Sequence, residues 1–389
     1  MRVIVRMSNH NQNKSFILSS SQVMSLITST IIGVGVLTLP RTVTEKAHQS
    51  GWISVLIGGM ISLAITWMIM KLSQRFHGKN ILSAGESVLG SKKNKWLGKV
   101  FAFPIAFIFM IYWILMTAGV ARTFGEVVVT AVLVKTPLEV TVGTMLFVAF
   151  LMVTYDMEVM ARVNEILLPI IIIPVLLIAV LSFQSAYFYR LLPLFPLDWI
   201  AVFKGVLAGV FGYQGYELMT LIMGNIQSER KEIRRAAMFG IAIPMLVYTL
   251  IVIAGTAAFG YEELKNLMWP TLELVKTTEV PGLILERIES AFLGVWVAAV
   301  FTTTANIYFA VCYLIKQLLG LKHHRYVAIV MLPALYYLAM WPRNVHLLFE
   351  YLTYASYIGF ISSLGIPLFL LVIAMIRKQG EKQKGGQPS

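Results

Sequence analysis

Gly33-Val34-Gly35-Val36-Leu37-Thr38-Leu39-Pro40-Arg41 interrupts a long apolar segment near the start of the chain. The two glycines lie near the middle of residues 18–46, a stretch long enough to cross a bilayer. Glycine destabilises a helix by about 1 kcal/mol relative to alanine, and lipid cannot satisfy the peptide groups that a break releases. A break at this depth is therefore expected to line a cavity or to be buried in protein.

A second stretch, Gly212-Tyr213-Gln214-Gly215-Tyr216-Glu217, has the same character within the apolar residues 200–226. Interrupted segments at corresponding positions of two halves are the best sequence pointer to a transporter-type site near the bilayer midplane. The alternative is that these glycines only allow close helix packing, as small residues often do.

Composition and length predict the class to which both segments belong. The 389 residues are 58% apolar and only 13% charged, which is typical of a polytopic membrane protein and not of a soluble one. At about 20 residues per crossing, we expect an all-α fold of ten transmembrane helices that divides into two sets of five. Their expected ranges are 18–46, 52–72, 100–124, 138–155, 166–183, 200–226, 236–259, 290–315, 326–341 and 347–376.

The charge distribution predicts how these spans are oriented. The formal charge is +13, and most of the 32 Lys and Arg residues fall in alternate connecting segments and at the two termini. By the positive-inside rule, both termini are expected to be cytoplasmic, with residues 1–17 and the basic tail 377–389 outside the membrane domain 18–376. No nucleic-acid recognition fold accompanies these charges, so nucleic acid is not an expected partner, whereas anionic lipid is.

Broken helices have a specific binding chemistry. Free N–H groups at the start of a half-helix attract an anion, and released carbonyl oxygens accept hydrogen bonds from an ammonium group. An α-amino acid carries both a carboxylate and an ammonium group. The expected ligand is therefore a small zwitterion, bound without any metal or cofactor.

Several polar residues at membrane depth are further candidates. Glu217 could contact an ammonium group, exchange a proton or cap a half-helix. Arg122 and Glu126 are spaced as a helical ion pair, for which a structural role is favoured. Tyr112 and Thr117 are candidates for facing the cavity. A cluster of four residues is a candidate for binding a small cation, with hydrogen bonding between helices as the alternative: Thr302, Thr303, Thr304 and Asn306.

Other features narrow the function. Soluble enzyme motifs such as H-E-x-x-H and G-x-S-x-G are absent from the sequence, so the protein is not expected to be an enzyme. Pro169, Pro174 and Pro244 each remove a backbone donor within a predicted span and are expected to bend it. The long acidic segment 261–289 is either a lid or an ordinary solvated loop.

Gly33 to Arg41, followed by Gly51-Trp52, resembles the start of the B subunit of bacterial spore nutrient-germinant receptors, a branch of the amino acid/polyamine/organocation transporter superfamily. The resemblance covers essentially the whole chain. It implies two inverted repeats of five helices, about 18–185 and 198–376, with the first helix of each interrupted. It also implies residence in the spore inner membrane and assembly with an A subunit and a C-subunit lipoprotein.

The same resemblance implies roles for the two glycine-containing stretches. Gly33, Val34 and Gly35 would bind the nutrient's carboxylate, and Tyr213, Gln214, Gly215 and Glu217 would lie beside its amino group or side chain. The expected function is a sensor subunit that binds an amino acid and signals germination. An amino-acid permease with the same site, with or without coupling to protons or cations, is the alternative. A channel is disfavoured because few charges lie within the spans.

Overall fold

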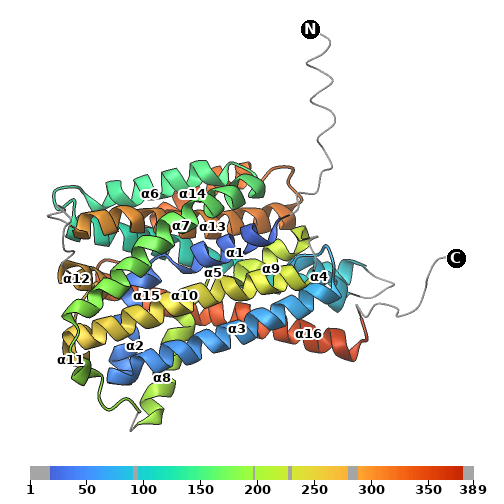
Figure 1. Ribbon diagram of the computed structural model, residues 1–389. Helices are drawn as coiled ribbons and strands as arrows, with labels where there is room; N and C mark the ends of the chain where they lie inside the picture. Colours follow the sequence, from blue (N-terminus) through green and yellow to red (C-terminus); the bar gives the residue numbers. More distant parts are fainter. Residues whose placement is uncertain (1–17, 91–94, 196–197, 227–229, 279–287, 380–389) are drawn as a thin grey trace.

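The computed structural model describes residues 18–90, 95–195, 198–226, 230–278 and 288–379. Within these ranges the chain is all-helical, as the sequence predicts, and Figure 1 shows its helices arranged as a single bundle. The predicted N-terminal segment 1–17 and most of the tail 377–389 lie outside the described residues, so these two boundaries stay predictions.

The first half of the bundle begins with a broken helix. Helix α1 ends at Ile31, three residues follow that are not helical, and α2 begins at Gly35. The elements of this half are α1 (Ser20–Ile31), α2 (Gly35–Ala47), α3 (Gly51–Arg75), α4 (Ile81–Leu89), α5 (Lys95–Ala131), α6 (Leu138–Val153) and α7 (Met157–Leu181).

The second half begins in the same way. Helix α8 ends at Gly212, and beyond the break the chain continues as short turns of 3₁₀ and α-helix up to Asn225. The main elements are α8 (Trp199–Gly212), α9 (Met219–Ile222), α10 (Arg230–Phe259), α11 (Tyr261–Leu264), α12 (Pro270–Lys276), α13 (Ile288–Leu319), α14 (Arg325–Met340), α15 (Val345–Phe360) and α16 (Ile366–Ile376). A π-helical turn, Ile361–Gly365, joins α15 to α16.

The two halves pack reciprocally. Helix α1 lies along α10, and its counterpart α8 lies along α3; α5 packs on α13, the equivalent helix of the other half. The second part of the first span, α2, contacts the first part of the sixth, α8, so the two broken spans run in opposite directions. This arrangement is that of an inverted repeat.

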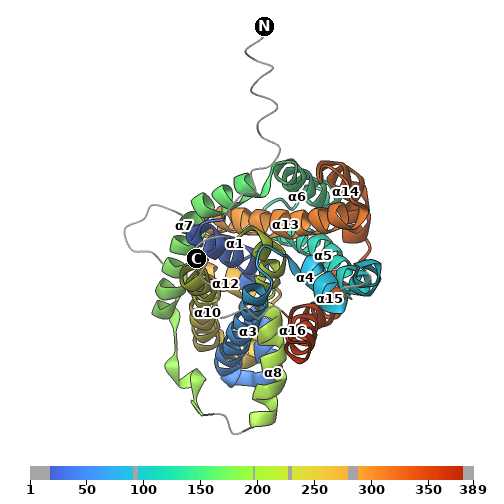
Figure 2. The same ribbon diagram turned by 90° about the vertical axis from the view of Figure 1, so that its right-hand side faces the viewer.

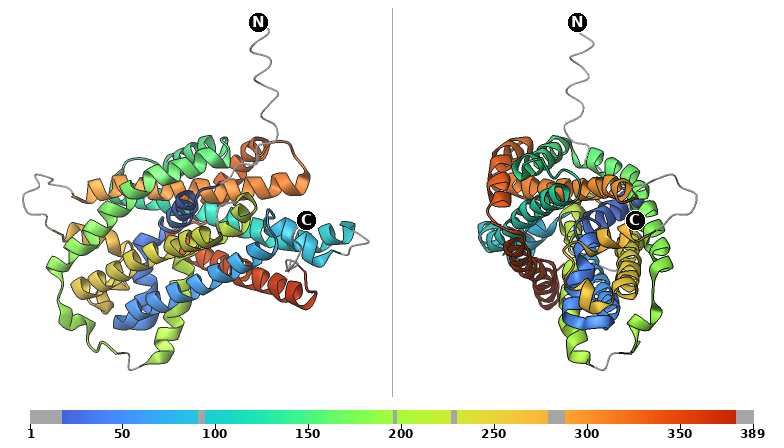
Figure 3. Two further views of the ribbon diagram at one scale, coloured as in Figure 1. Left: turned by 45° about the vertical axis from the view of Figure 1, so that its right-hand side comes forward. Right: turned by 90° about the vertical axis from the view of Figure 1, so that its left-hand side faces the viewer.

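The helices fall into two groups when the bundle is viewed along its length. Figure 2 shows α6, α13 and α14 on one side and α3, α8 and α16 on the other. The same two groups lie at opposite sides in both panels of Figure 3. The core is mainly apolar, and its largest fully buried side chains include Trp113, Trp296 and Tyr248.

Six helical stretches of the described chain are long and apolar enough to cross a membrane, and the shorter apolar helices α6, α8 and α14 accompany them. The protein is thus an integral multi-pass membrane protein. Because these three helices have only 14 to 16 residues, the number of ten crossings stays a prediction. The expected loop 261–289 contains two helices, α11 and α12, within residues 261–278, and its last two residues begin α13.

Candidate functional site

The first break leaves free donors at the start of α2. No side chain caps this helix, and Gly33 N–H and Leu37 N–H bond to nearby carbonyl groups. In the described chain, no partner accepts from the N–H groups of Val34, Gly35 and Val36. The positive end of the α2 dipole and three free donors therefore meet at one point, which suits an anion.

The second break is held open by a buried carboxylate. Gly215 has φ 131°, a conformation that favours glycine, and its N–H donates to Glu217 Oε2 at 2.7 Å. Tyr112 Oη of α5 donates to Glu217 Oε1 at 2.8 Å, and Glu217 is only 1% exposed. Glu217 thus satisfies a released backbone donor and connects the break to α5.

The two breaks meet at a cavity of about 990 Å³. At its inner end are Gly35 of the first break and Gly212 of the second, and an ideal Cβ at position 35 would lie 3.3 Å from the Gly212 carbonyl oxygen. That oxygen has no hydrogen-bond partner within the described ranges. Free donors and a free acceptor therefore line the same space, the pattern that a zwitterion requires.

The lining of the cavity extends to exposed residues at one end of the bundle. Its walls come from α2, α8 and α15, and its mouth carries the exposed charged residues Glu45, Lys46, Lys204 and Glu350. Helices α11 and α12 lie at this end and α4 and α16 at the other (Figure 1). The Arg41 guanidinium stands 5.1 Å from the centre of the Phe349 ring across the cavity wall.

The predicted site residues divide into two groups. Val34, Gly35, Gln214 and Thr303 line the cavity. The other predicted ligand-binding residues are buried but do not line the cavity: Gly33, Tyr112, Tyr213, Gly215 and Glu217. Their direct contact with a ligand therefore stays a prediction.

Gln214 is the cavity residue with an unsatisfied polar atom. Its Nε2 donates to the Ser356 carbonyl at 2.7 Å, an acceptor that fixes which end of the amide is the nitrogen. Its Oε1 is buried and has no partner among the described residues. Tyr213 instead points away from the cavity and donates to the Val55 carbonyl at 3.1 Å.

The glycines of the first break allow close packing as well. A Cβ at Gly33 would lie 2.4 Å from Thr303 Oγ1, and one at Gly35 would lie 2.8 Å from Tyr248 Oη. Trp296 Nε1 donates to the Gly33 carbonyl at 3.1 Å. Both interpretations of these glycines, a binding site and close helix contact, therefore have structural support at the same positions.

The predicted polar cluster on α13 ties this helix to the end of α1. Thr303 Oγ1 donates to the Ser29 carbonyl at 2.9 Å, and Thr302 Oγ1 lies 3.4 Å from the same oxygen. Asn306 bonds to Thr30 Oγ1 and exchanges two hydrogen bonds with Asn164 of α7. Thr304 donates only within its own helix, to the Val300 carbonyl, as Thr117 does to Trp113 in α5.

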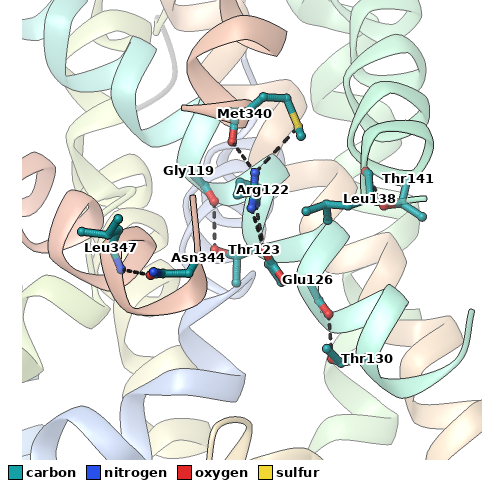
Figure 4. A network of polar contacts seen from close by, with 11 residues as sticks. Gly119, Arg122, Thr123, Glu126, Thr130, Leu138, Thr141, Met340, Asn344 and Leu347 are labelled. Carbon is teal, nitrogen blue, oxygen red and sulfur yellow. Dashed lines mark hydrogen bonds and ion pairs between the residues drawn. The ribbon is translucent and has the colours of Figure 1, made fainter. Parts of the chain in front are cut away.

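Arg122 and Glu126 form the predicted ion pair. The guanidinium Nη2 and Nε lie 2.8 and 2.9 Å from Glu126 Oε1, and Nη1 reaches the Ala339 carbonyl at 3.4 Å and Met340 Sδ at 3.8 Å (Figure 4). A cation at the C-terminal end of α14 is stabilised by the helix dipole. The pair joins α5 to α14 away from the cavity, as its predicted structural role requires.

Sequence reasoning missed most of the cavity wall. The missed lining residues near the breaks come from five helices: Thr30, Ile31, Met116, Phe211, Ile307 and Ser356. Further along α2, Thr38 and Thr42 had a usable signal, because they lie four residues apart on one face of this helix. In the described chain, no group of three or more His, Cys, Asp or Glu residues that could hold a metal ion is present.

The sequence matches a family model described as "Spore germination protein" over residues 17–347. Spore germination protein YndE of Bacillus subtilis (strain 168) is 29% identical over 366 residues, covering 94% of this chain and 98% of that protein. Spore germination protein B2 of the same organism is 28% identical, with 93% and 96% coverage. Spore germination protein GerLB of Bacillus cereus is 25% identical, with 93% and 95% coverage.

Solved transporter-like structures share the fold. The crystal structure of MhsT in complex with L-phenylalanine matches with a TM-score of 0.70 and 14% identity, covering 95% of this chain and 91% of that one. Mhp1, a nucleobase-cation-symport-1 family transporter in a closed conformation with bromovinylhydantoin, matches with a TM-score of 0.60, 11% identity and coverage of 92% and 93%. At such identities the likeness concerns the fold alone.

Proposed function

Because the chain belongs to the spore germination protein family, we propose that it is a nutrient-germinant receptor subunit that binds an amino acid between its two broken helices. Binding of the ligand shifts the helix bundle between two states, and the shift is passed to partner proteins. The fold is permease-like, so the same site also serves the alternative function, amino-acid transport.

The observation that carries this proposal is the pairing of free backbone groups across the cavity. The N–H groups of Val34, Gly35 and Val36 suit a carboxylate, and the Gly212 carbonyl suits an ammonium group. Gln214 Oε1 adds a second buried acceptor for the same ligand. The MhsT structure supports the amino-acid class, since it is a complex with L-phenylalanine and shares the fold.

Membership of the family supports a proposal for the partners and the location. We propose assembly with an A subunit and a C-subunit lipoprotein in the inner membrane of the spore, with both termini cytoplasmic. The Lys and Arg distribution along the sequence supports this orientation.

Purified protein in liposomes tests the proposal. Labelled amino acids would be screened for binding, and uptake would be measured under imposed proton and sodium gradients. Saturable binding without uptake supports the sensor, and concentrative uptake supports the permease. Absence of binding across the amino-acid panel, for protein that retains its folded state, would overturn the proposed ligand class.

A cation-coupled permease is the second candidate, and the α13 cluster favours it. Thr302 and Thr303 bring two hydroxyl oxygens to the Ser29 carbonyl at the end of α1. Oxygen ligands of this kind suit a small hard cation. Uptake that requires a sodium gradient and is lost in Thr303→Val would support coupling, whereas uptake indifferent to sodium would exclude this role for the cluster.

A further inference from the structure

Pro40 releases a backbone acceptor in the outer half of the first span. Proline has no N–H, so the carbonyl of Val36, four residues earlier in α2, receives no bond from position 40. Thr271 Oγ1 of α12 donates to this carbonyl at 2.6 Å, and Thr271 is only 2% exposed. A side chain from the segment at the cavity mouth therefore takes the place of the missing helix donor.

Pro244 has the same effect beside the inner half. It deprives the Gly240 carbonyl of α10 of its helix donor. Thr28 Oγ1 of α1 donates to this carbonyl at 3.1 Å, and Thr28 is fully buried. In both cases a threonine from one element bonds to a carbonyl that a proline has released in another.

These two contacts involve different neighbours of the broken helix. Thr271 connects α2 to α12, which also packs on α10 and α13, while Thr28 connects α1 to α10. At the far end of α2, the His48 and Tyr261 rings meet edge to face at 5.2 Å, so α11 contacts the same half-helix. Each half of the first span thus has its own attachment, and the turn between them, with its free N–H groups, is where the ligand is proposed to bind.

We propose that Thr271 and Thr28 are positioning residues, each holding one half of the broken first span through a carbonyl released by a proline. We call the Thr271–Val36 and Thr28–Gly240 contacts the outer and inner clasps. Because the clasps are separate, α2 can loosen while α1 stays in place. The inference rests on the proposed function in one respect, that α2 carries the N–H groups offered to the ligand.

Thiol labelling of buried reporter cysteines measures the opening of each half separately. In a Cys312→Ala background, Val43→Cys reports on α2 and Val23→Cys on α1, since both valines are fully buried. Labelling by N-ethylmaleimide then proceeds through the open population. Thr271→Val and Thr28→Val remove each hydroxyl while keeping the side-chain shape, and Thr271→Ser and Thr28→Ser retain the donor.

We expect Thr271→Val to speed labelling at position 43 by about fivefold. This ratio corresponds to lowering the free energy of opening by about 1 kcal/mol. Labelling at position 23 should stay unchanged. Thr28→Val should give the opposite selectivity, and both serine variants should behave like the parent. Thr277→Val is the matched control, because the exposed Thr277 hydroxyl bonds only within its own segment, to the Leu274 carbonyl.

Three results would overturn the inference. They are equal acceleration at both reporters, no acceleration at either, and serine variants that behave like the valine variants. Thr271→Ala and Thr28→Ala replace any valine variant that does not fold. Because labelling is measured without a ligand, an amino-acid screen that fails in the parent protein would refute the proposed function and leave the clasp result standing.

Discussion

Glu217 is surrounded by donors, which determines what its substitution should do. Its two carboxylate oxygens accept from Gly215 N–H and Tyr112 Oη, at 2.7 and 2.8 Å. An amide can reproduce this arrangement, since its oxygen accepts from Gly215 while its NH₂ donates to the Tyr112 hydroxyl, which can act as an acceptor. An apolar side chain cannot.

We therefore expect the Glu217→Gln variant to respond to the ligand as the parent protein does at each pH. Its free energy of unfolding should fall by less than about 1 kcal/mol. Glu217→Leu should lose about 1–3 kcal/mol, because it leaves a buried N–H unsatisfied. Thermal unfolding and ligand titration at several pH values check both variants. A pH-dependent ligand response that disappears in Glu217→Gln would instead assign this carboxylate to proton exchange or ammonium binding.

Gly35 has no room for a side chain. A Cβ there would lie 2.8 Å from Tyr248 Oη, which itself donates to the Ile31 carbonyl at 2.8 Å. We expect Gly35→Ala to weaken amino-acid binding by about tenfold or more, equivalent to about 1.4 kcal/mol, and Gly35→Leu to abolish it without preventing membrane insertion. Gly294→Ala is the control, since nothing lies within 4 Å of its Cβ; unchanged affinity in Gly35→Leu would remove this residue from the site.

At the scale of the elements, the Arg122–Glu126 pair joins α5 to the end of α14. Both side chains are largely buried, so removing only one partner leaves a charge without compensation. We expect Arg122→Met to lower the free energy of unfolding by about 3 kcal/mol. The double variant Arg122→Met, Glu126→Leu should recover most of it; additive losses in this double-mutant cycle would show that the pair does not act as a unit.

His324 fixes the start of α14 to the turn after α6. Its Nε2 faces the carbonyl oxygens of Val153 and Tyr155 at 2.9 and 3.1 Å, so this nitrogen carries the proton. Burial lowers the pKa of His324 below its ordinary value of 6.5, although both hydrogen bonds oppose that shift. Below pH 6.5 the His324 ring takes up a proton in the unfolded chain, whereas in the folded chain it stays neutral until the pH reaches the lowered pKa.

The contribution of His324 should therefore be complete above pH 6.5 and decline as the pH falls towards the lowered pKa. Thermal unfolding temperatures between pH 7.5 and about 5 should fall less steeply in His324→Gln than in the parent. His323→Gln, which changes the exposed neighbour, should retain the steeper dependence. Parallel pH profiles for the parent and His324→Gln would contradict the assignment.

At the scale of the whole molecule, the cavity mouth and the end formed by α4 and α16 lie at opposite ends of the bundle (Figure 1). With the termini inside, the mouth should face away from the cytoplasm. Asn266→Cys at the mouth should react with a membrane-impermeant thiol reagent on intact cells, and Lys322→Cys only after permeabilisation, since both positions are exposed. The reverse labelling pattern would show that the cavity mouth faces the cytoplasm.

Much of the fold could be predicted, because long apolar runs leave the backbone in lipid only one way to satisfy its hydrogen bonds, the helix. The breaks at Ile32–Val34 and Tyr213–Gly215 were predictable for the same reason, since glycines at that depth weaken the helix where protein must cover it. Gly35 and Gln214 of the predicted site do line the cavity. Gly33 and Tyr213 do not, because the direction in which a residue of a break faces depends on how the helices on either side of it pack against their neighbours.

What the sequence determined by itself is local: helices where apolar runs are long and interruptions where glycines fall within them. Only the tertiary structure decided which released groups find partners. Glu217 meets Gly215, and Thr271 meets the carbonyl freed by Pro40, while the N–H groups at the start of α2 stay free beside the cavity. These pairings join residues on different elements, and their geometry is fixed by the packing of the whole bundle.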